Sequence, residues 1–506
     1  MTALAMTLPV TGGVGLAELA RALAPFEPKL RGDGAVRVSG VRQDSRHVAA
    51  GELFVARSGG RVSGADFAAA AVASGASAVL AEPGAVTAPL GVPVLEVSDV
   101  RRALGAAAEV VYGAPSRALP LIGITGTNGK TTTSLLVEHA LVALGARPAR
   151  LGTLGFSFGG AEEEGNLTTP EADEVSRRLA DVVERGGTHF VMEVSSHALS
   201  LARVDALTFR VAAFTNLSQD HLDFYPSMAE YGAAKERLFT ALSPAVSVIA
   251  IDDEFGRGLA TRARGRLLTT GRAADALVRP LSFTADSRGL RAAVTTPRGS
   301  AALESRLLGE HNLENLLLAL GILLALDIEP LQAARALGAV KAIPGRLERC
   351  DEDDDDIRVL VDYAHTPDAL ERVLAAVRKI TPAEVACVFG CGGDRDPDKR
   401  PKMGAAVGRG AERAILTSDN PRTEDPRAIA NAVEAGLRTG TARYTVELDR
   451  ARAIEEAVLA AEPGDSVLLA GKGHEPYQII GTEKRAFDDR VEARRALALR
   501  RARRQG

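Results

Sequence analysis

Short apolar runs alternate with longer alanine-rich or amphipathic segments along most of this chain. In its first part, the runs at 51–56 (GELFVA), 77–82 (SAVLAE) and 92–97 (VPVLEV) predict strands, and the segment 65–76 predicts a helix. Continuous apolar runs are typical of parallel strands that helices cover on both faces. This part of the chain is therefore predicted to form an α/β module.

The same alternation continues after two breaks rich in glycine or proline, near 113–120 (GAPSRALP) and near 341–348 (KAIPGRLE). Further runs that predict strands lie at 119–125, 188–194, 209–215, 357–363, 384–390, 413–419 and 466–471. The chain is thus predicted to be an α/β protein of three domains, which span 1–115, 116–345 and 346–506. In parallel α/β sheets ligands bind at the carboxyl ends of the strands, so the polar residues that follow each run are the candidates for function.

Length, composition and charge fit a globular protein without a nucleic-acid or membrane role. A chain of 506 residues is too long for one core, and its net charge of −4 does not indicate an electrostatic nucleic-acid binder. The longest apolar run, 316–326, is shorter than the about 20 residues that a membrane-spanning helix needs. The acidic stretch 351–356 and the arginine-rich end 490–506 are both expected to be solvated.

The cysteines indicate the compartment. Cys350, Cys387 and Cys391 are odd in number and form no CxxC pair, which predicts free thiols in a reducing environment. We expect a monomer in the cytoplasm.

Residues 121–136 (LIGITGTNGKTTTSLL) predict a phosphate-binding loop. An apolar strand leads to a glycine turn, and a helix is expected from about Lys130 to Leu144. Backbone N–H groups of such a turn and of the helix start converge on one spot, which suits phosphate oxygens. The stretch departs from the usual G-x-x-x-x-G-K-[ST] pattern, because Ile124 stands where a glycine is expected. The alternative is a glycine-rich turn without a ligand. The residues of the predicted loop are Gly126, Thr127, Asn128, Gly129, Lys130, Thr131 and Thr132.

Two further stretches carry candidate chemistry. Glu193 ends the apolar run 188–194, and a carboxylate at a strand end beside a phosphate loop commonly supports Mg²⁺. Many strands end in an acid, however, so this residue alone is a weak signal. His221 and Lys235 follow in one short segment, which can equally be a turn and an amphipathic helix with a surface lysine.

A series of motifs then identifies a family resemblance. The chain contains, in this order, GTNGKTTT, EVSSHAL, TNLSQDHLDFY, AAKERLF, GEHNLENLLLAL, PGRLE, VDYAHTPDAL, GCGGDRDPDKRPKM, SDNPRTEDP and GKGHE. Together they resemble the Mur ligases, over nearly the whole chain, and this family writes its phosphate loop as GTNGKT. The resemblance implies a UDP-sugar-binding N-terminal domain, a P-loop ATPase domain in the middle and a Rossmann-like C-terminal domain that binds an amino acid.

The resemblance also implies the reaction. Within the family, the motifs are most similar to those of the members that add the third residue of the peptidoglycan stem peptide. Such enzymes use ATP to convert the carboxylate of UDP-MurNAc-L-Ala-D-Glu into an acyl phosphate, which an amine then attacks. By family position Lys130, His221 and Lys235 would be catalytic. Two Mg²⁺ ions would be held by Thr131, Glu193, His221 and Lys235, with Lys235 carrying a carbamate.

Substrate contacts can be assigned by family position too. For ATP these are Asn312, Asn315, Arg346, Asp362 and His365, in addition to the loop. For the sugar-peptide they are Ser45, Thr168, Thr169, Ser195 and Arg203. The chain departs from related enzymes at Leu201, where they often carry a glutamine, which puts one polar contact to the sugar-peptide in doubt.

The stretch SDNPRTEDP bears on which amine is added. Meso-diaminopimelate has a second carboxylate beside its distal amine, and Arg422 with Asn420 offers a bidentate cation and an amide for it. The acceptor residues implied by the family are Arg395, Asp419, Asn420, Pro421, Arg422, Gly471 and Glu475, with Glu475 facing the distal ammonium. Three alternatives stay open here: L-lysine or L-ornithine as acceptor, a ligase similar to folylpolyglutamate synthetase, and a non-catalytic nucleotide-binding switch.

Overall fold

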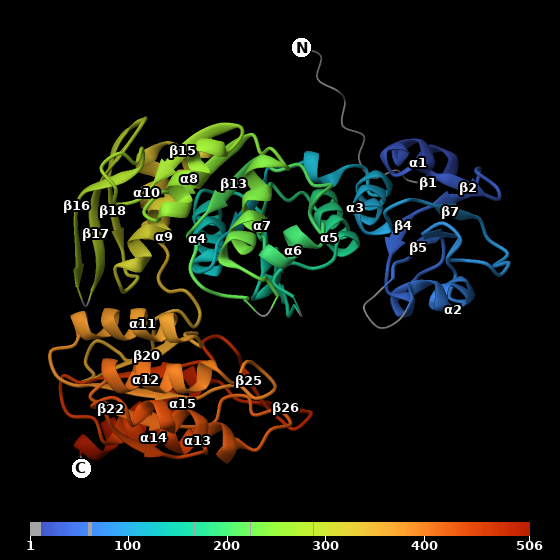
Figure 1. Cartoon of the computed structure of the whole chain (residues 1–506). Coiled ribbons are helices and arrows are strands. Elements are labelled where there is room, and N and C mark those ends of the chain that lie inside the picture. Colours follow the sequence, from blue (N-terminus) through green and yellow to red (C-terminus); the bar gives the residue numbers. More distant parts are fainter. Residues whose placement is uncertain (1–11, 59–62, 166, 223, 287, 506) are drawn as a thin grey trace. The chain divides into compact units, whose positions relative to one another are not determined.

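A computed structural model describes residues 12–58, 63–165, 167–222, 224–286 and 288–505 (Figure 1). The chain divides into two compact units. The first comprises the residues up to 280 together with 295–301 and 314–337, and the second comprises 281–294, 302–313 and the residues from 338 onward. The predicted boundaries at 115 and 345 stay predictions, and residues 1–11 of the first predicted domain lie outside the described part.

The first unit begins with a five-stranded sheet in the order β2-β7-β6-β5-β4, parallel except for β2. Its strands are β2 (Lys29–Arg31), β4 (Gly40–Arg42), β5 (Glu52–Ala56), β6 (Ala78–Ala81) and β7 (Val94–Glu96). Both faces are buried: Leu53 and Val55 pack in the core that includes α1 and α3, whereas Phe54 and Ala56 pack in the core that includes α2. The accompanying elements are α1 (Leu16–Ala22), α2 (Ala68–Ala73), α3 (Val100–Val111), the pair β1 (Val14–Gly15) and β3 (Arg37–Val38), and 3₁₀ helices at Ala24–Phe26, Ser45–His47, Gly64–Phe67 and Pro115–Arg117.

An eight-stranded sheet forms the centre of the first unit, in the order β11-β10-β9-β12-β8-β13-β14-β15. The strands from β9 to β15 in that order are parallel, and β10 and β11 extend one edge in antiparallel pairing. The strands are β8 (Leu121–Thr125), β9 (Pro148–Gly152), β10 (Gly155–Phe158), β11 (Ala161–Glu163), β12 (His189–Glu193), β13 (Val211–Phe214), β14 (Val246–Ala250) and β15 (Arg266–Thr270). The helices are α4 (Lys130–Ala143), α5 (Ala172–Glu184), α6 (Ser196–Ser200), α7 (Met228–Thr240), α8 (Glu254–Arg262), α9 (His311–Ala325) and α10 (Pro330–Gly338).

A three-stranded sheet, β16 (Arg279–Asp286), β17 (Gly289–Thr296) and β18 (Gly299–Ser305), was not predicted from the sequence. Along β17 and β18 buried and exposed residues largely alternate, so only one face of each strand is covered. The apolar positions are therefore spaced by polar ones and form no continuous run of the kind that marked the other strands.

The second unit contains a six-stranded sheet in the order β19-β20-β24-β21-β22-β23, parallel except for β19. Along β21, Cys387 and Phe389 point into the core that includes α11, α12 and α13, whereas Ala386 and Val388 point into the core that includes α14 and α15. The strands are β19 (Glu348–Arg349), β20 (Arg358–Asp362), β21 (Val385–Phe389), β22 (Arg413–Leu416), β23 (Arg443–Val446) and β24 (Ser466–Ala470), with a hairpin of β25 (Tyr477–Ile480) and β26 (Glu483–Ala486). The helices are α11 (Pro367–Ile380), α12 (Lys399–Gly410), α13 (Pro426–Leu437), α14 (Arg450–Leu459) and α15 (Asp489–Gln505).

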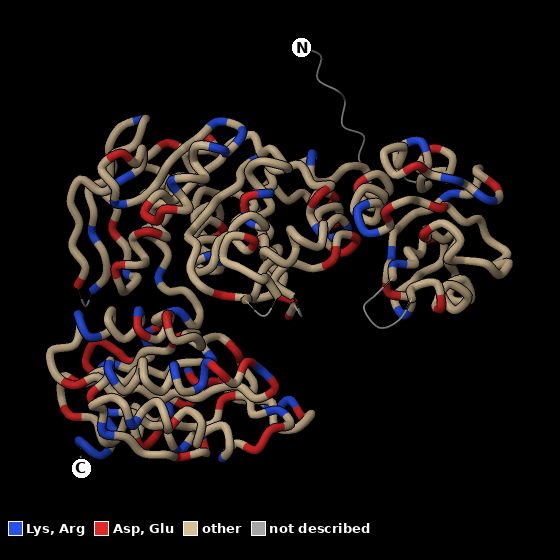
Figure 2. Tube along the Cα trace, viewed as in Figure 1, with Lys and Arg blue, Asp and Glu red and all other residues tan. Residues whose placement is uncertain are grey.

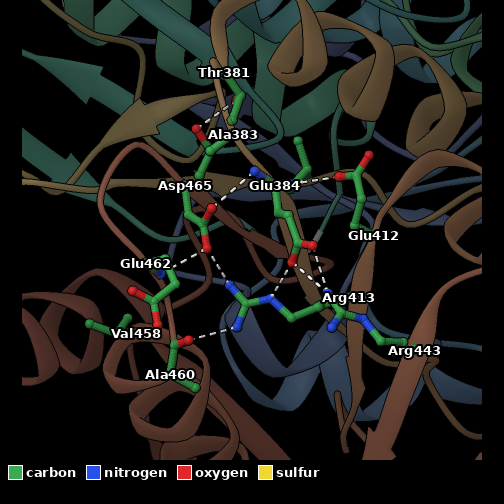
Figure 3. A network of polar contacts seen from close by, with 12 residues as sticks. Thr381, Ala383, Glu384, Glu412, Arg413, Arg443, Val458, Ala460, Glu462 and Asp465 are labelled. Atoms are coloured by element: carbon green, nitrogen blue, oxygen red, sulfur yellow. Dashed lines mark hydrogen bonds and ion pairs between the residues drawn. The ribbon is translucent and has the colours of Figure 1, made fainter.

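The amino ends of these parallel strands are tied together by a polar network (Figure 3). Arg413, at the start of β22, contacts Asp465 at 2.6 Å and Glu384 at 3.2 Å, which precede β24 and β21. Arg443, at the start of β23, reaches the same Glu384 at 2.7 Å. This network fixes the amino ends of the strands. The candidate acceptor residues lie at the other end of the sheet, after the carboxyl ends of β22 and β24.

The expectation that the two charged stretches are solvated holds only in part, because 352–354 are exposed whereas the side chains of Asp355 and Asp356 are largely covered by α15. Arg500 pairs with Asp356 at 2.8 Å and Arg501 with Asp355 at 2.6 Å, so α15 and the acidic loop compensate each other. Clusters of opposite sign that are far apart in sequence are brought together by the fold, which a reading of local composition misses. Elsewhere Figure 2 shows acidic and basic residues interspersed over both units.

The predicted strands and the helix from Lys130 are confirmed within a few residues. In the described part of the chain, no helix is long and apolar enough to cross a membrane. The three cysteines are free and buried.

Candidate active site

The predicted phosphate loop lies between the central strand β8 and the helix α4. Gly126 and Gly129 both have positive φ, of 141° and 86°. A Cβ atom on Gly126 would lie 1.8 Å from the Thr215 hydroxyl, and one on Gly129 would lie 2.4 Å from the Asn315 amide oxygen. Both positions therefore require glycine for conformation and for space. Ile124, which broke the usual pattern, is a fully buried strand residue of β8.

Two lysines converge on the backbone of this loop. Lys130 donates to the carbonyl oxygens of Gly126 at 2.9 Å and Thr127 at 2.8 Å, and Lys235 on α7 donates to Gly126 at 2.8 Å. Lys235 is 1% exposed. Burial, and after it the charge of Lys130, lowers the pKa of Lys235 well below its usual value, and Asp220 offsets part of this effect. The alternative of a surface lysine at this position is thus excluded, and Lys235 has the environment of a functional amine.

Tyr231 on α7 connects the phosphate loop with two candidate residues, Lys235 on the same helix and His221 in the preceding turn. Its hydroxyl lies 3.2 Å from the Thr127 hydroxyl, and the Lys235 ammonium lies 4.4 Å from the centre of its ring. The His221 ring packs edge-on against Tyr231 at 5.9 Å, and His221 has a positive φ of 54°. One buried aromatic side chain therefore holds Thr127, His221 and Lys235 in a common arrangement.

The opposite side of the loop is held by an amide pair. Asn216 accepts from the Asn128 N–H at 3.1 Å and donates to the Asn128 carbonyl at 3.1 Å. Thr127 also donates its N–H to the Asn216 carbonyl, at 2.8 Å. The loop is thus fixed before any ligand arrives, as preorganised anion binding requires.

Glu193 at the end of β12 is fully buried beside the helix start. One of its carboxylate oxygens accepts from the Thr131 hydroxyl at 3.0 Å and from the Thr153 hydroxyl at 3.1 Å. Thr168 lies 3.1 Å from Thr153. A buried carboxylate and a hydroxyl in contact are the hard oxygen donors that Mg²⁺ prefers, so Thr131 and Glu193 fit this ion. His221 and Lys235 both contact Tyr231.

The residues assigned to the sugar-peptide lie mostly together. The Thr169 hydroxyl donates to the Glu193 carbonyl at 2.9 Å and accepts from the Ser195 N–H at 3.0 Å. Arg203 donates to the Thr169 carbonyl at 3.0 Å and pairs with Glu171 at 2.8 Å. Leu201, at the end of α6, offers no polar side-chain atom there.

Ser45 lies in the 3₁₀ helix Ser45–His47 of the five-stranded module, where the preceding Asp44 is the N-cap. A nearby contact ties this module to the central sheet. Asp173, in the first turn of α5, accepts from the Gln43 N–H at 3.2 Å, and its second carboxylate oxygen is buried without a partner. Burial raises the pKa of Asp173 to about 6.

The residues assigned to ATP fall into both units. Asn315 on α9 lies against the loop at Gly129, and Asn312 donates to the Leu308 carbonyl at 2.8 Å. In the second unit the Arg346 guanidinium stacks over the Tyr363 ring at 4.8 Å.

Two more of these residues shape the start of the second unit. Asp362 accepts from the N–H groups of Leu347 and Ala364, both at 2.8 Å. Burial raises the pKa of Asp362, and Arg346 opposes this shift. His365 is exposed and contacts the Tyr363 carbonyl at 2.9 Å.

The acceptor candidates form a cluster at the carboxyl ends of β22 and β24. Asn420 donates to Glu475 at 2.9 Å, and both side chains contact the buried Lys472, at 3.2 and 3.4 Å. Asp419 lies 4.0 Å from Lys472, and a Cβ atom on Gly471 would come within 2.6 Å of Asp419. Gly471, which has a φ of 111°, is therefore required where these carboxylates approach the backbone.

Arg422 lies beside this cluster, directly after Pro421. Its guanidinium donates to the Gly393 carbonyl at 2.7 Å, and its φ is 52°. A Cβ atom on Gly392 would contact both Arg422 and Arg395, at 3.0 and 3.8 Å, so the two arginines approach the same turn. The second unit thus brings together the Arg422 guanidinium, an amide and carboxylates, which can recognise an amino acid that carries both charges.

Comparison with known proteins identifies the family. Residues 37–112, 124–323 and 345–473 match the models described as Mur ligase family, catalytic domain, as Mur ligase middle domain, and as Mur ligase, glutamate ligase domain. The chain is 45% identical over 469 residues to the UDP-N-acetylmuramoyl-L-alanyl-D-glutamate--2,6-diaminopimelate ligase of Gloeobacter violaceus, which covers 92% of this chain and 95% of the relative. This chain belongs to the Mur ligase family.

Two further similarities span most of this Mur ligase. The protein of the same name from Thermosynechococcus vestitus is 47% identical over 464 residues, which cover 91% of this chain and 93% of the relative. A solved structure of a UDP-N-acetylmuramoyl-L-alanyl-D-glutamate--2,6-diaminopimelate ligase is 33% identical, with a TM-score of 0.70, and covers 97% of this chain and 99% of that one. The predicted family and three-module α/β architecture are confirmed.

Three contact residues of this Mur ligase were missed from the sequence. Tyr231 precedes Lys235 by four residues, so helical spacing placed it on the same face, and Lys472 stands within the quoted motif GKGHE. Thr153 carries no local signal, because it reaches Glu193 only through the pairing of β9 with β12.

Proposed function

We propose that this Mur ligase uses ATP to join meso-diaminopimelate to the glutamyl carboxyl group of UDP-MurNAc-L-Ala-D-Glu. The observation that carries the proposal is the 45–47% identity, over more than nine tenths of the chain, to relatives named for this reaction. The arrangement of the residues agrees with it, since one unit offers a cationic phosphate loop and the other offers a cluster that suits a doubly charged amino acid.

The chemistry needs two anions to approach each other. The glutamyl carboxylate attacks the γ-phosphate of ATP, which gives an acyl phosphate and ADP; the acceptor amine then adds to the acyl carbon, and phosphate leaves. No nucleophile from the protein is required. Lys130 and the N–H groups at the start of α4 would bind the phosphate oxygens, and preformed positive charge of this kind stabilises the transition state most.

Mg²⁺ would be held by Thr131 and Glu193, which supply oxygen donors, and when bound it would neutralise phosphate charge. We further propose that Lys235 is carbamylated and, with His221, serves a second ion. Only a neutral amine adds CO₂, and the lowered pKa of Lys235 favours the neutral form. The adduct would be an anion, so it would also compensate the charge of Lys130.

The substrate assignments support the remaining parts of the proposal. Thr168, Thr169, Ser195 and Arg203 would bind the sugar-peptide, with Ser45 at its uridine end, and Asn312, Asn315, Arg346, Asp362 and His365 would bind ATP. Asn420, Arg422, Arg395 and Glu475 would bind the acceptor, with Asp419, Pro421 and Gly471 shaping the site. A monomer in the cytoplasm stays a prediction.

The experiment measures ADP release from the purified protein with UDP-MurNAc-L-Ala-D-Glu and, in turn, meso-diaminopimelate, L-lysine or L-ornithine. We expect release that depends on both the sugar-dipeptide and diaminopimelate. Release without the sugar-dipeptide would remove the ligase proposal, and equal rates with lysine would remove only the acceptor assignment. A folylpolyglutamate synthetase-like activity is not favoured, because the five-stranded N-terminal module and the acceptor cluster would have no role in it. A non-catalytic switch would need neither Lys235 nor Arg422.

A further inference from the structure

Lys472 is a buried charge to which the proposed chemistry assigns no role. Its side chain is 0% exposed, and its ammonium lies 3.4 Å from one oxygen of Glu475 and 4.0 Å from Asp419. It also donates to the Asn420 amide oxygen at 3.2 Å. Burying an ammonium is costly unless it is paired, and here its carboxylate and amide partners are residues of the acceptor cluster, with the Tyr477 ring 5.7 Å away.

These contacts fix the orientation of Asn420. Its amide oxygen accepts from Lys472 and from the Ile479 N–H, the latter at 2.9 Å. The amide nitrogen must therefore face Glu475, to which it donates at 2.9 Å. A single oxygen of Glu475, Oε2, receives both the Asn420 amide and the Lys472 ammonium, and among the described residues no hydrogen bond engages the other oxygen, Oε1.

The charges of the cluster also leave room for one ammonium group. Asp419 and Glu475 together bring two negative charges, and Lys472 offsets one of them. One negative charge is left for an incoming ammonium group. Without Lys472, the two carboxylates would repel each other and the Asn420 amide oxygen would lose one of its two donors.

We propose that Lys472 is a positioning residue that sets the preference for an acceptor with a distal ammonium group. It holds Oε2 of Glu475 inside the cluster and so presents Oε1 to that ammonium. The inference rests on the proposed function, because it concerns the acceptor of the same reaction.

The test compares two acceptors, meso-diaminopimelate and 2-aminopimelate, which lacks only the distal amine. For the wild type we expect a clear preference for diaminopimelate. In Lys472→Met the KM for diaminopimelate should rise about 10- to 100-fold, the range expected for a lost hydrogen bond to a charged group. Its kcat and its KM for ATP should change less than about threefold, and the KM for 2-aminopimelate should not rise, so the preference should collapse.

Two further variants keep the test decisive. Lys484→Met, which removes an exposed lysine whose ammonium lies 3.8 Å from the centre of the neighbouring Tyr477 ring, should retain the wild-type preference. Lys472→Arg keeps the charge and should retain part of the preference, and it replaces Lys472→Met as the test if the methionine variant does not fold. In a Glu475→Gln background, Lys472→Met should alter the preference no further.

Equal losses with both acceptors, or an unchanged preference in Lys472→Met and Lys472→Arg, would overturn the inference and leave Lys472 with a purely structural role. Failure of the proposed function looks different, because the wild type itself would then release no ADP in response to diaminopimelate.

Discussion

The phosphate loop and the acceptor cluster each bury a lysine, but they compensate its charge differently. Lys235 is buried against the Gly126 carbonyl, and among the described residues no carboxylate forms a hydrogen bond or ion pair with it. Lys472 is buried between Asn420 and Glu475, within 4.0 Å of Asp419. The pKa of Lys235 is lowered accordingly. The first site is short of negative charge before its ligands arrive, whereas the second has most of its charges balanced in advance.

This difference follows what each site would receive. ATP and an acyl phosphate bring negative charge, and carbamylation of Lys235 by CO₂ would create it with release of a proton, so a loop that two lysines approach gains most when these groups bind. An amino acid with two ammonium and two carboxylate groups brings no net charge, and a cluster in which a lysine already offsets one of two carboxylate charges can select it by geometry. Four predictions test this comparison.

Removal of Lys130 should have the largest effect. Lys130→Met deletes the cation that lies at the start of α4, and kcat should fall about 10³-fold, the upper range for losing one preformed transition-state donor. The matched control is Lys29→Met, in the edge strand β2, which should leave kcat unchanged. The measurement is steady-state ADP release at saturating substrates. A loss below about tenfold would contradict the view that this loop is the charge-deficient site.

Lys235→Met should lower kcat about 10²-fold or more, and added bicarbonate should not restore it. The wild type, supplied with ¹³C-bicarbonate, should give a carbamate carbon signal in NMR spectra that the variant lacks. Full activity of the variant would remove the carbamate. A signal that persists in the variant would assign the carbamate to another amine.

The sequence predicted those parts of the two sites whose residues are close together in the chain, and it missed contacts between residues that are far apart. The strand, loop and helix around Gly126 to Thr132 form from neighbouring residues, so these elements were predicted well. Lys235 reaches Gly126 across more than a hundred residues, and its burial could not be read from a segment that also fits a surface helix. The pairing of Arg500 with Asp356 and the half-covered strands β16–β18 were missed for related reasons, because each depends on a distant partner or on a single buried face.

Asp173 is the opposite case to Lys235, because it is a buried carboxylate for which no ion pair with a cation is found among the described residues. Its folded pKa of about 6 lies above the ordinary aspartate value of 3.8, so the folded state holds this proton more tightly than the unfolded chain does. Stability from this group is therefore fully present at low pH and is lost as the pH rises from about 4 to about 6. Asp173→Asn should remove that loss. Its free energy of unfolding relative to wild type should increase by about 2 kcal/mol between about pH 4.5 and about pH 7.

Urea unfolding followed by circular dichroism at the two pH values measures this change. Asp181→Asn, on the same helix but half exposed and paired with Arg185, is the control and should differ from wild type by less than about 0.5 kcal/mol at either pH. A pH-independent difference for Asp173→Asn would show that the carboxyl does not ionise in this range.

Tyr231→Phe should have the smallest effect on the kinetic constants. It tests which part of Tyr231 positions the residues of the phosphate loop. The variant loses only the hydroxyl contact to Thr127 and keeps the ring that lies 4.4 Å from the Lys235 ammonium. One neutral hydrogen bond contributes about 1 kcal/mol, so the KM for ATP should rise about fivefold while kcat stays within about twofold. Tyr231→Leu removes the ring as well and should lower kcat in addition, because Lys235 and His221 lose their shared support. If Tyr231→Phe lowered kcat as much as Tyr231→Leu does, the hydroxyl bonded to Thr127, rather than the ring, would position Lys235.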